Sequence, residues 1–295
     1  MENTSVAKAL ALLPVELRRR GQALPPDLQT RVEELRLRLG QPVTVLAEGE
    51  EHPFPDCPPV TAGQLLDVLE LATGASVHTV GESIRRGFVT VSGGLRIGLC
   101  GTVVPGSEGR VAGLRELSSL AIRLPRAVPG CGAAAFEKLW REDFPSTLIL
   151  SPPGGGKTTL LREWVRRLSE RGTRVALADE RGEVAGVWKG SPQFSLGPCT
   201  DVLTGAPKGE GGLMLLRAMN PQLIAMDEIT AAEDLEAVER IANCGVRLLA
   251  TAHGGGVFEL RGRPLYRRLL HLGIFRRAVV ITGRGAERRY GVTEL

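Results

Sequence analysis

The chain has 295 residues, enough for one large domain or two modest ones, each with its own buried core. Its residues are 43% hydrophobic and 24% charged, which is typical of a folded globular protein and excludes disorder along the whole chain. The net charge of +4 is too small for composition alone to indicate a nucleic-acid-binding protein.

Helical spacing marks the first part of the chain, up to Gly40. Apolar residues recur there at three- and four-residue intervals, at Leu28, Val32, Leu35 and Leu39. This spacing predicts a helix that Gly40 and the following Gln-Pro pair end. A short strand is then expected at 43–46, a proline-rich surface loop at 52–59 and a second helix at 63–72.

A β-hairpin is predicted next, because two apolar segments at 87–91 and 95–99 flank a Ser-Gly-Gly turn. A further strand is expected at 120–124. Together these elements predict a small α+β N-terminal domain over residues 1–135. The segment 125–145 is the expected junction to a second domain over residues 136–295.

Four short apolar runs in the second domain predict a parallel sheet covered on both faces. They lie at 147–150, 174–178, 223–226 and 247–252, separated by helical or loop segments. Each run ends in polar residues, and ligands of such sheets bind beyond the carboxyl ends of the strands. All four polar ends are therefore expected at one edge.

A phosphate-binding loop connects the first of these runs to a helix. Its residues are Pro153, Gly154, Gly155, Gly156, Lys157, Thr158 and Thr159. Glycines let backbone amides surround an anion, Lys157 would reach the β- and γ-phosphates, and Thr158 would offer its hydroxyl to magnesium. Ser151 replaces the first glycine of the usual P-loop pattern. The expected fold class is α/β, a P-loop NTPase domain of the RecA/AAA-like type with ATP and Mg²⁺ as cofactors.

An acidic pair follows the third apolar run. Asp227 is expected to hold magnesium through its water shell, and Glu228 to polarise the attacking water. An Asp-Glu pair is common on surfaces, but at the end of a buried strand that follows a P-loop it indicates catalysis. Thr230 and Glu233 are expected to form a capping box at the start of the next helix.

A second charged cluster ends the run at 174–178 and includes Asp179 and Glu180. It is expected to contact the nucleotide or metal of a neighbouring subunit, with a solvated surface loop as the alternative. His253 ends the last run and would report the γ-phosphate by a hydrogen bond. Thr251 could serve instead, and a buried structural histidine is the competing interpretation.

Two arginines, Arg96 and Arg123, stand inside strand-like segments of the N-terminal domain. Either they face solvent, or they act as arginine fingers that stabilise charge on a transferring phosphoryl group. The basic segment 261–277 has three interpretations: an amphipathic surface helix, a subunit interface or a nucleic-acid-binding patch.

The scattered cysteines, five in number and never in a C-x-x-C pair, favour reduced thiols in a cytoplasm. No apolar run is long enough to cross a bilayer, and no secretory signal is visible. We therefore expect a cytoplasmic protein that would reach a membrane only through a partner.

Several motifs resemble the stage III sporulation protein AA family over roughly residues 30 to 285. They lie at 34–38, 93–101, 179–183, 200–203, 207–209, 217–221 and 226–229. The family is related to the secretion and type IV pilus motor ATPases. The resemblance implies an ATPase that forms a homo-oligomer, usually a hexameric ring, docks on membrane-embedded channel proteins and serves the channel between mother cell and forespore.

The same resemblance implies roles for individual residues. It favours Arg96 and Arg123 as nucleotide-reaching arginines, Asp179 and Glu180 as an acidic box, and His253 as a histidine box that holds a single histidine. Two alternatives stay open, a nucleic-acid-binding P-loop ATPase and a nucleotide-gated scaffold with little turnover.

Overall fold

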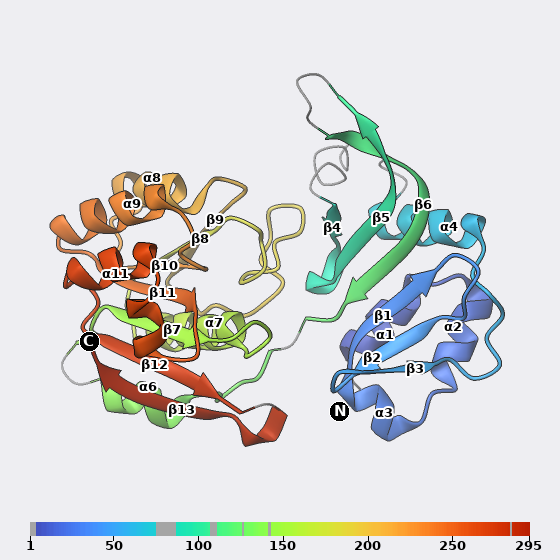
Figure 1. Ribbon diagram of the computed structural model, residues 1–295, viewed down its shortest axis with the longest axis horizontal. Helices are drawn as coiled ribbons and strands as arrows, with labels where there is room; N and C mark the ends of the chain where they lie inside the picture. The colour runs from blue at the N-terminus through green and yellow to red at the C-terminus, as the bar shows by residue number, and fades with distance from the viewer. Residues whose placement is uncertain (1–3, 75–86, 107–110, 126, 141–142, 284) are drawn as a thin grey trace. The chain divides into compact units, whose positions relative to one another are not determined.

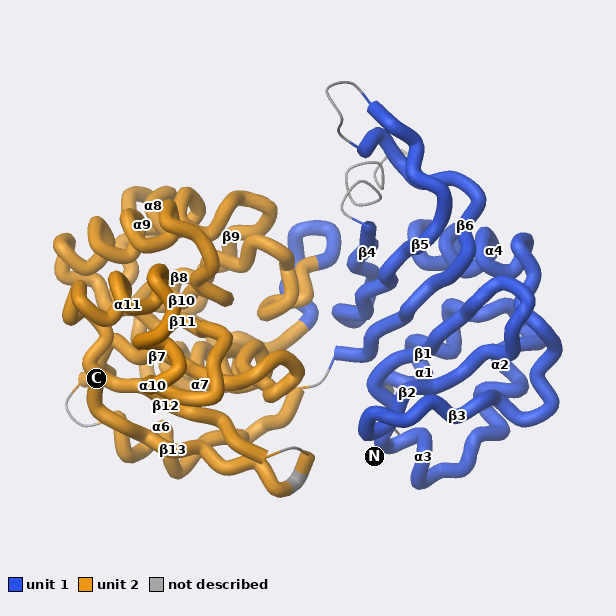
Figure 2. The backbone as a smooth tube through the Cα atoms, in the orientation of Figure 1, with its two compact units in different colours: residues 1–125, 188–193 blue, residues 126–187, 194–295 orange. Residues whose placement is uncertain are grey.

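The computed structural model describes residues 4–74, 87–106, 111–125, 127–140, 143–283 and 285–295. The chain divides into two units (Figure 2). Unit 1 contains Met1–Pro125 and Trp188–Gln193, and unit 2 contains Arg126–Val187 and Phe194–Leu295. The short loop Trp188–Gln193 groups with unit 1, where the Gly93 amide donates to Gln193 Oε1 at 2.9 Å.

Unit 1 is built on a six-stranded sheet of order β3-β2-β1-β6-β5-β4, in which all paired strands are antiparallel. Its elements in chain order are α1 (Thr4–Ala11), α2 (Val15–Gln22), α3 (Pro26–Arg31), β1 (Val32–Arg38), β2 (Thr44–Ala47), β3 (Glu50–Pro53), α4 (Ala62–Thr73), β4 (Phe88–Thr90), the 3-10 turn η1 (Ser92–Gly94), β5 (Arg96–Pro105) and β6 (Val111–Arg123).

The helix expected to run through Val32 and Leu35 to Leu39 is wrong, because this segment is the strand β1. Leu35 and Leu37 are fully buried, whereas the arginines between and after them stay partly exposed. That two-residue alternation suits a strand, and pairing with β2 and β6 fixes its register. The helical spacing of Val32 and Leu35 does not reflect a helix. A register shift between Val32 and Glu34 lets both side chains be buried although they are three residues apart.

The remaining expectations for unit 1 are largely confirmed. The strand at 43–46 is β2, the helix at 63–72 is α4, and the hairpin is β4 with β5. Thr61 and Gln64 form a reciprocal capping box at the start of α4. The strand at 120–124 is the end of the much longer β6. The loop expected at 52–59 is wrong in its first two residues, which belong to β3 because they pair with β2.

Unit 2 is built on a seven-stranded sheet of order β13-β12-β7-β11-β10-β8-β9. Its elements are α6 (Ala133–Leu139), β7 (Thr147–Ser151), α7 (Lys157–Glu170), β8 (Val175–Asp179), β9 (Thr200–Thr204), α8 (Lys208–Ala218), β10 (Leu223–Met226), α9 (Ala232–Asn243), β11 (Arg247–His253), α10 (Val257–Arg261), α11 (Pro264–His271), β12 (Arg277–Thr282), the 3-10 turn η3 (Gly285–Glu287) and β13 (Arg289–Glu294). Within the described ranges, every strand pair is parallel except β12 with β13.

Both faces of this sheet are buried, as the four apolar runs predict. Ile149 packs into a core with residues of α6 and α7, whereas its neighbours Leu148 and Leu150 pack into a core with residues of α8 to α11. The helices accordingly lie on the two sides of the sheet (Figure 1). The expected α/β fold, a mainly parallel sheet preceded by a smaller α+β unit, is confirmed.

All five cysteines are free thiols. Cys100 on β5 and Cys244 after α9 are exposed, and the other three are partly buried. Burial raises the pKa of the Cys131 thiol to about 11. This thiol therefore stays protonated at neutral pH.

Candidate active site

The loop between β7 and α7 has the backbone that an anion cradle needs. Gly154 and Gly156 have φ angles of 73° and 101°, a region that favours glycine. Gly155 is required for a different reason, because a Cβ atom there would collide with the Ser151 side chain. The loop closes where the Gly155 amide donates to the Pro152 carbonyl at 3.1 Å. Thr158 and Thr159 follow in the first turn of α7.

Lys157, the first residue of α7, points back over the loop. Only 7% of it is exposed, and its Nζ donates to the Ser151 carbonyl at 3.3 Å. Burial lowers the pKa of this ammonium group, and the nearby carboxylates of Glu228 and Asp227 oppose that effect. The acidic pair therefore lies close enough to Lys157 for a direct electrostatic interaction.

His253 connects the lysine to the acidic pair. Its Nδ1 lies 2.7 Å from Lys157 Nζ, and its Nε2 lies 2.7 Å from Glu228 Oε1. An ammonium group can only donate, so Nδ1 accepts and the ring proton on Nε2 is donated to Glu228. Two residues before His253 on β11, the Thr251 hydroxyl donates to Asp227 Oδ1 at 3.1 Å. Residues from the ends of β7, β10 and β11 thus converge at one edge, as expected.

The surroundings of His253 and Glu228 are held by α11. The Arg263 guanidinium donates to the His253 carbonyl at 2.9 Å, and the Tyr266 hydroxyl donates to the Ile229 carbonyl at 3.0 Å. Tyr266 and Leu269 are buried while Arg267 and Arg268 are exposed. Of the three interpretations of the segment 261–277, the amphipathic surface helix is the one that α11 shows.

The capping box expected from Thr230 and Glu233 is wrong by one residue. Helix α9 begins at Ala232, and the carboxylate of Asp234 accepts the amides of Thr230 and Ala231 at 2.9 and 3.0 Å. Asp234 is the third helical residue, so its side chain reaches back where that of Glu233 does not.

Asp179 and Glu180 are engaged in contacts within unit 2. Asp179 is 1% exposed, and its carboxylate accepts the amides of Glu183, Val184 and Ala185 at 3.0, 3.1 and 2.8 Å. Burial raises the pKa of Asp179 to about 6, although these hydrogen bonds act in the opposite direction. Glu180 pairs with Lys208 at 3.0 Å. Both carboxylates thus shape the loop after β8, and their contact with a nucleotide stays a prediction.

Arg96 and Arg123 lie in unit 1, opposite one another on β5 and β6. The Arg96 guanidinium lies 3.6 Å from the centroid of the Phe88 ring. The Arg123 Nε atom lies 3.2 Å from Glu34 Oε2, and 62% of the Arg123 side chain is exposed. The two cations therefore form one patch on the sheet of unit 1. Their reach to a nucleotide stays a prediction.

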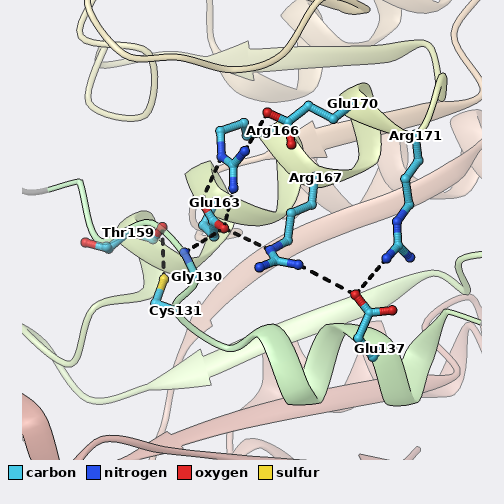
Figure 3. A network of polar contacts seen from close by, with 9 residues as sticks. All are labelled: Gly130, Cys131, Glu137, Thr159, Glu163, Arg166, Arg167, Glu170 and Arg171. Atoms are coloured by element: carbon cyan, nitrogen blue, oxygen red, sulfur yellow. Dashed lines mark hydrogen bonds and ion pairs between the residues drawn. The ribbon is translucent and has the colours of Figure 1, made fainter.

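A network around Glu163 joins α7 to the segment before α6 and to α6 itself (Figure 3). The Glu163 carboxylate accepts the Gly130 amide at 2.9 Å and pairs with Arg166 and Arg167. Beside it, Cys131 Sγ lies 3.9 Å from the Thr159 carbonyl. The segment before α6 is thereby attached to the helix that carries the P-loop lysine.

One arginine at the P-loop was missed by the sequence interpretation. A Cβ atom on Gly156 would lie 3.2 Å from Cζ of Arg288, so this guanidinium packs directly on the loop. Arg288 stands beside another arginine, Arg289, in a polar segment. No spacing distinguishes the two before the pairing of β12 with β13 is known.

The residues present fit a magnesium nucleotide. The loop offers glycine amides, a buried ammonium group and a helix N-terminus to phosphates. Among the described residues, no three His, Cys, Asp or Glu side chains group into a metal site. A hydroxyl and one carboxylate, from Thr158 and Asp227, suit Mg²⁺, which is usually held by few protein ligands together with substrate phosphates.

Comparison with known proteins decides the family. The family described as "Sporulation stage III, protein AA" matches residues 6–292. The chain belongs to this family. Stage III sporulation protein AA of Bacillus subtilis (strain 168) is 34% identical over 264 residues, which cover 88% of this chain and 85% of that protein. The family expected from the motifs is confirmed.

The solved structures of the ATPase DotB and of a pilus retraction motor share the fold. The ATPase DotB of Yersinia pseudotuberculosis has a TM-score of 0.62 at 13% identity, covering 95% of this chain and 78% of its own. The pilus retraction motor PilT with bound ADP has a TM-score of 0.60 at 16% identity, covering 94% and 82%. At these identities the likeness concerns the fold. Within the described ranges of this chain, no helix is long and apolar enough to cross a membrane.

Proposed function

We propose that this protein is an ATPase that binds ATP with magnesium at the P-loop and hydrolyses it. The observation that carries the proposal is the continuous contact from Lys157 through His253 to Glu228, at the edge where the P-loop lies. A phosphate-binding cation and a water-polarising carboxylate are the two groups that phosphoryl transfer to water requires.

Each residue has a defined task in this proposal. Amides of residues 153–159 and the Lys157 ammonium bind the phosphates, and Thr158 with Asp227 would hold magnesium, which neutralises charge on the phosphates. Glu228 orients the attacking water. His253 holds Glu228 and releases Lys157 when phosphates bind. Arg96 and Arg123 would supply positive charge to the transferring group.

Steady-state hydrolysis of ATP tests the proposal. We expect the wild type to be active, Lys157→Ala to lose ATP binding, and Glu228→Gln to bind ATP with hydrolysis reduced at least about a hundredfold. Lys138→Ala and Glu236→Gln are matched controls, because both side chains are exposed on other helices. Equal hydrolysis by Glu228→Gln and wild type would contradict the assigned role of Glu228. A wild type that binds ATP without turnover would favour the nucleotide-gated scaffold.

We further propose that hydrolysis drives motion of a homo-oligomer, a hexameric ring by family resemblance, against membrane-embedded channel proteins of the sporulation apparatus. Family membership and the fold shared with secretion and pilus ATPases support this proposal. Light scattering with and without a non-hydrolysable ATP analogue tests the assembly. A monomer under both conditions would count against a ring.

A further inference from the structure

Gly283, which directly follows β12, stands at a position that restricts the side chain. Gly283 has a φ angle of 75°, and a Cβ atom there would lie 2.5 Å from the Glu287 carbonyl oxygen. Only glycine fits both restrictions. The turn η3 follows, and Arg288 leaves it immediately before β13. Arg288 therefore lies one residue before the antiparallel pair of Thr282 with Arg289.

Close to its turn, the same hairpin is attached beside the start of α7. Tyr290, two residues after Arg288, forms a side-chain hydrogen bond with Cys131. Cys131 in turn contacts the Thr159 carbonyl in the first turn of α7. Strand β13 also contacts α6, which directly follows Cys131. These contacts hold the hairpin against the helix whose N-terminus forms the phosphate cradle.

The Arg288 guanidinium lies on the loop itself. Its Cζ and Nε atoms are 3.2 and 3.3 Å from the position that a Cβ atom of Gly156 would occupy. Gly156 is the last glycine before Lys157, and amides of this part of a P-loop surround the α- and β-phosphates. The cation is thus placed where a diphosphate would lie.

Among the described residues, no hydrogen-bond or ion-pair partner of Arg288 explains this position. Its Nε atom is buried and has no hydrogen-bond partner among the described residues. No ion pair of Arg288 occurs in the described part of the chain. A guanidinium group stays charged at any physiological pH, and a buried donor without a partner costs free energy. Beside it lies a pocket of about 630 Å³ that is lined by Thr282, Gly283, Glu287, Arg288 and Arg289.

We propose that Arg288 binds the α- or β-phosphate of the nucleotide held by the P-loop of the same chain. The inference rests on the proposed nucleotide binding and adds a cation to it from the C-terminal hairpin. Because ADP and ATP both carry the α- and β-phosphates, Arg288 contributes equally to the binding of either nucleotide. It differs in this respect from Arg96 and Arg123, whose proposed task concerns the group being transferred.

Isothermal titration calorimetry with ADP, ATP and inorganic pyrophosphate tests this proposal. A charge-assisted hydrogen bond lost in Arg288→Ala should weaken ADP and ATP binding by a similar factor, about tenfold to a hundredfold. Pyrophosphate binding should weaken by the same factor. Arg288→Lys should fall between wild type and Arg288→Ala, because lysine keeps the charge without the planar fork. Arg276→Ala, a change at an exposed arginine before β12, should bind as the wild type does.

The outcomes separate the two proposals. If Lys157→Ala abolishes nucleotide binding and Arg288→Ala leaves it unchanged, the role of Arg288 is overturned. The proposed nucleotide binding at the P-loop then stands. A loss confined to ADP and ATP, with pyrophosphate binding unchanged, would overturn the phosphate assignment. A wild type that binds none of the three would overturn both proposals. Thermal unfolding without ligand checks that each variant is folded, and Arg288→Lys carries the test if Arg288→Ala is not.

Discussion

Nζ of Lys157 lies 2.7 Å from Nδ1 of His253, although 96 positions separate the two residues in the chain. The register of β7 with β11 explains the contact, because His253 pairs with Ser151 across these parallel strands. The lysine that would bind phosphate is thereby held by a ring whose other nitrogen holds Glu228. A phosphate that draws Lys157 away would leave His253 bound to Glu228 alone, so we expect nucleotide binding to affect the position of this carboxylate.

His253→Ala should therefore reduce hydrolysis more than binding. Without the ring, Glu228 loses the partner that fixes its orientation, while Lys157 remains free to bind phosphate. We expect kcat to fall by about a hundredfold, as for a misplaced catalytic group, with KM for ATP changed only a few-fold. Steady-state kinetics measures both constants. His271→Ala, at an exposed histidine of α11, is the control, and an unaltered kcat in His253→Ala would refute the coupling.

Asp179 should make stability depend on pH in an unusual direction. Its pKa is raised from 3.8 to about 6 by burial, so the native state binds its proton more tightly than the unfolded chain does. The stabilising contribution of this group is complete below about pH 4 and is lost as the pH rises towards about 6. At about 1.4 kcal/mol per pH unit the loss is at most about 3 kcal/mol.

Urea unfolding of wild type and Asp179→Asn between pH 4 and 7, a range that includes the raised pKa of Asp179, measures this effect. Asparagine keeps the shape and one acceptor oxygen but does not titrate, so wild type should lose stability relative to the variant as the pH rises. Glu180→Gln is the comparison, because the pKa of Glu180 is lowered and its contribution has the opposite sign. If the difference in unfolding free energy between wild type and Asp179→Asn did not change with pH, burial would not be the main influence on the pKa of Asp179.

Glu163→Ala should destabilise unit 2. The carboxylate is 5% exposed and accepts the Gly130 amide in addition to two arginines (Figure 3), so its loss leaves several partners unsatisfied. We expect the free energy of unfolding to fall by about 2 kcal/mol, measured in urea. Glu170→Ala is the matched control on the same helix. Its exposed pair with Arg166 should be worth less than about 1 kcal/mol. If both variants lost the same free energy of unfolding, burial of the Glu163 carboxylate would not explain its contribution to stability.

Arg96→Ala and Arg123→Ala should each lower kcat by a large factor, on the order of a thousandfold for an arginine that contacts the transferring phosphoryl group. Mixing either variant with Glu228→Gln tests whether a neighbouring subunit completes the site. Recovered activity in the mixture would mean that each subunit supplies what the other lacks. Arg115→Ala, at an exposed arginine of β6, is the control. Full activity of both arginine variants would show that Arg96 and Arg123 are solvent-facing residues without a role in hydrolysis.

Much of unit 2 was predictable from the sequence for a physical reason. The strands β7, β8, β10 and β11 are buried on both faces, so each appears as an uninterrupted apolar run followed by polar residues. Parallel pairing then requires those polar ends to share an edge. The contact of Lys157 with His253 follows from that rule, but its 2.7 Å distance depends on register, which the runs alone do not specify.

Other parts could not be predicted because their sequence signals conflict or are weak. In β1, Leu35 and Leu37 alternate with charged residues, yet Leu28, Val32 and Leu39 extend the same apolar set at helical spacing. Strand β9 is only half buried and has no apolar run. Strand β12 follows a basic helix closely and begins with an arginine. Its apolar centre therefore does not stand out as a strand in the sequence. The position of Arg288 at the P-loop can be recognised only once the pairing of β12 with β13 is known.

The unequal burial of the cysteines has a practical consequence. Cys100 belongs to unit 1 and Cys244 to unit 2, and both thiols are open to solvent, whereas the thiol nearest the P-loop, Cys131, is protonated and partly enclosed. A maleimide dye pair would thus attach preferentially at one site on each unit of the natural sequence. Energy transfer between the two dyes would then report, in single molecules and without engineered cysteines, whether the units move when ATP is added.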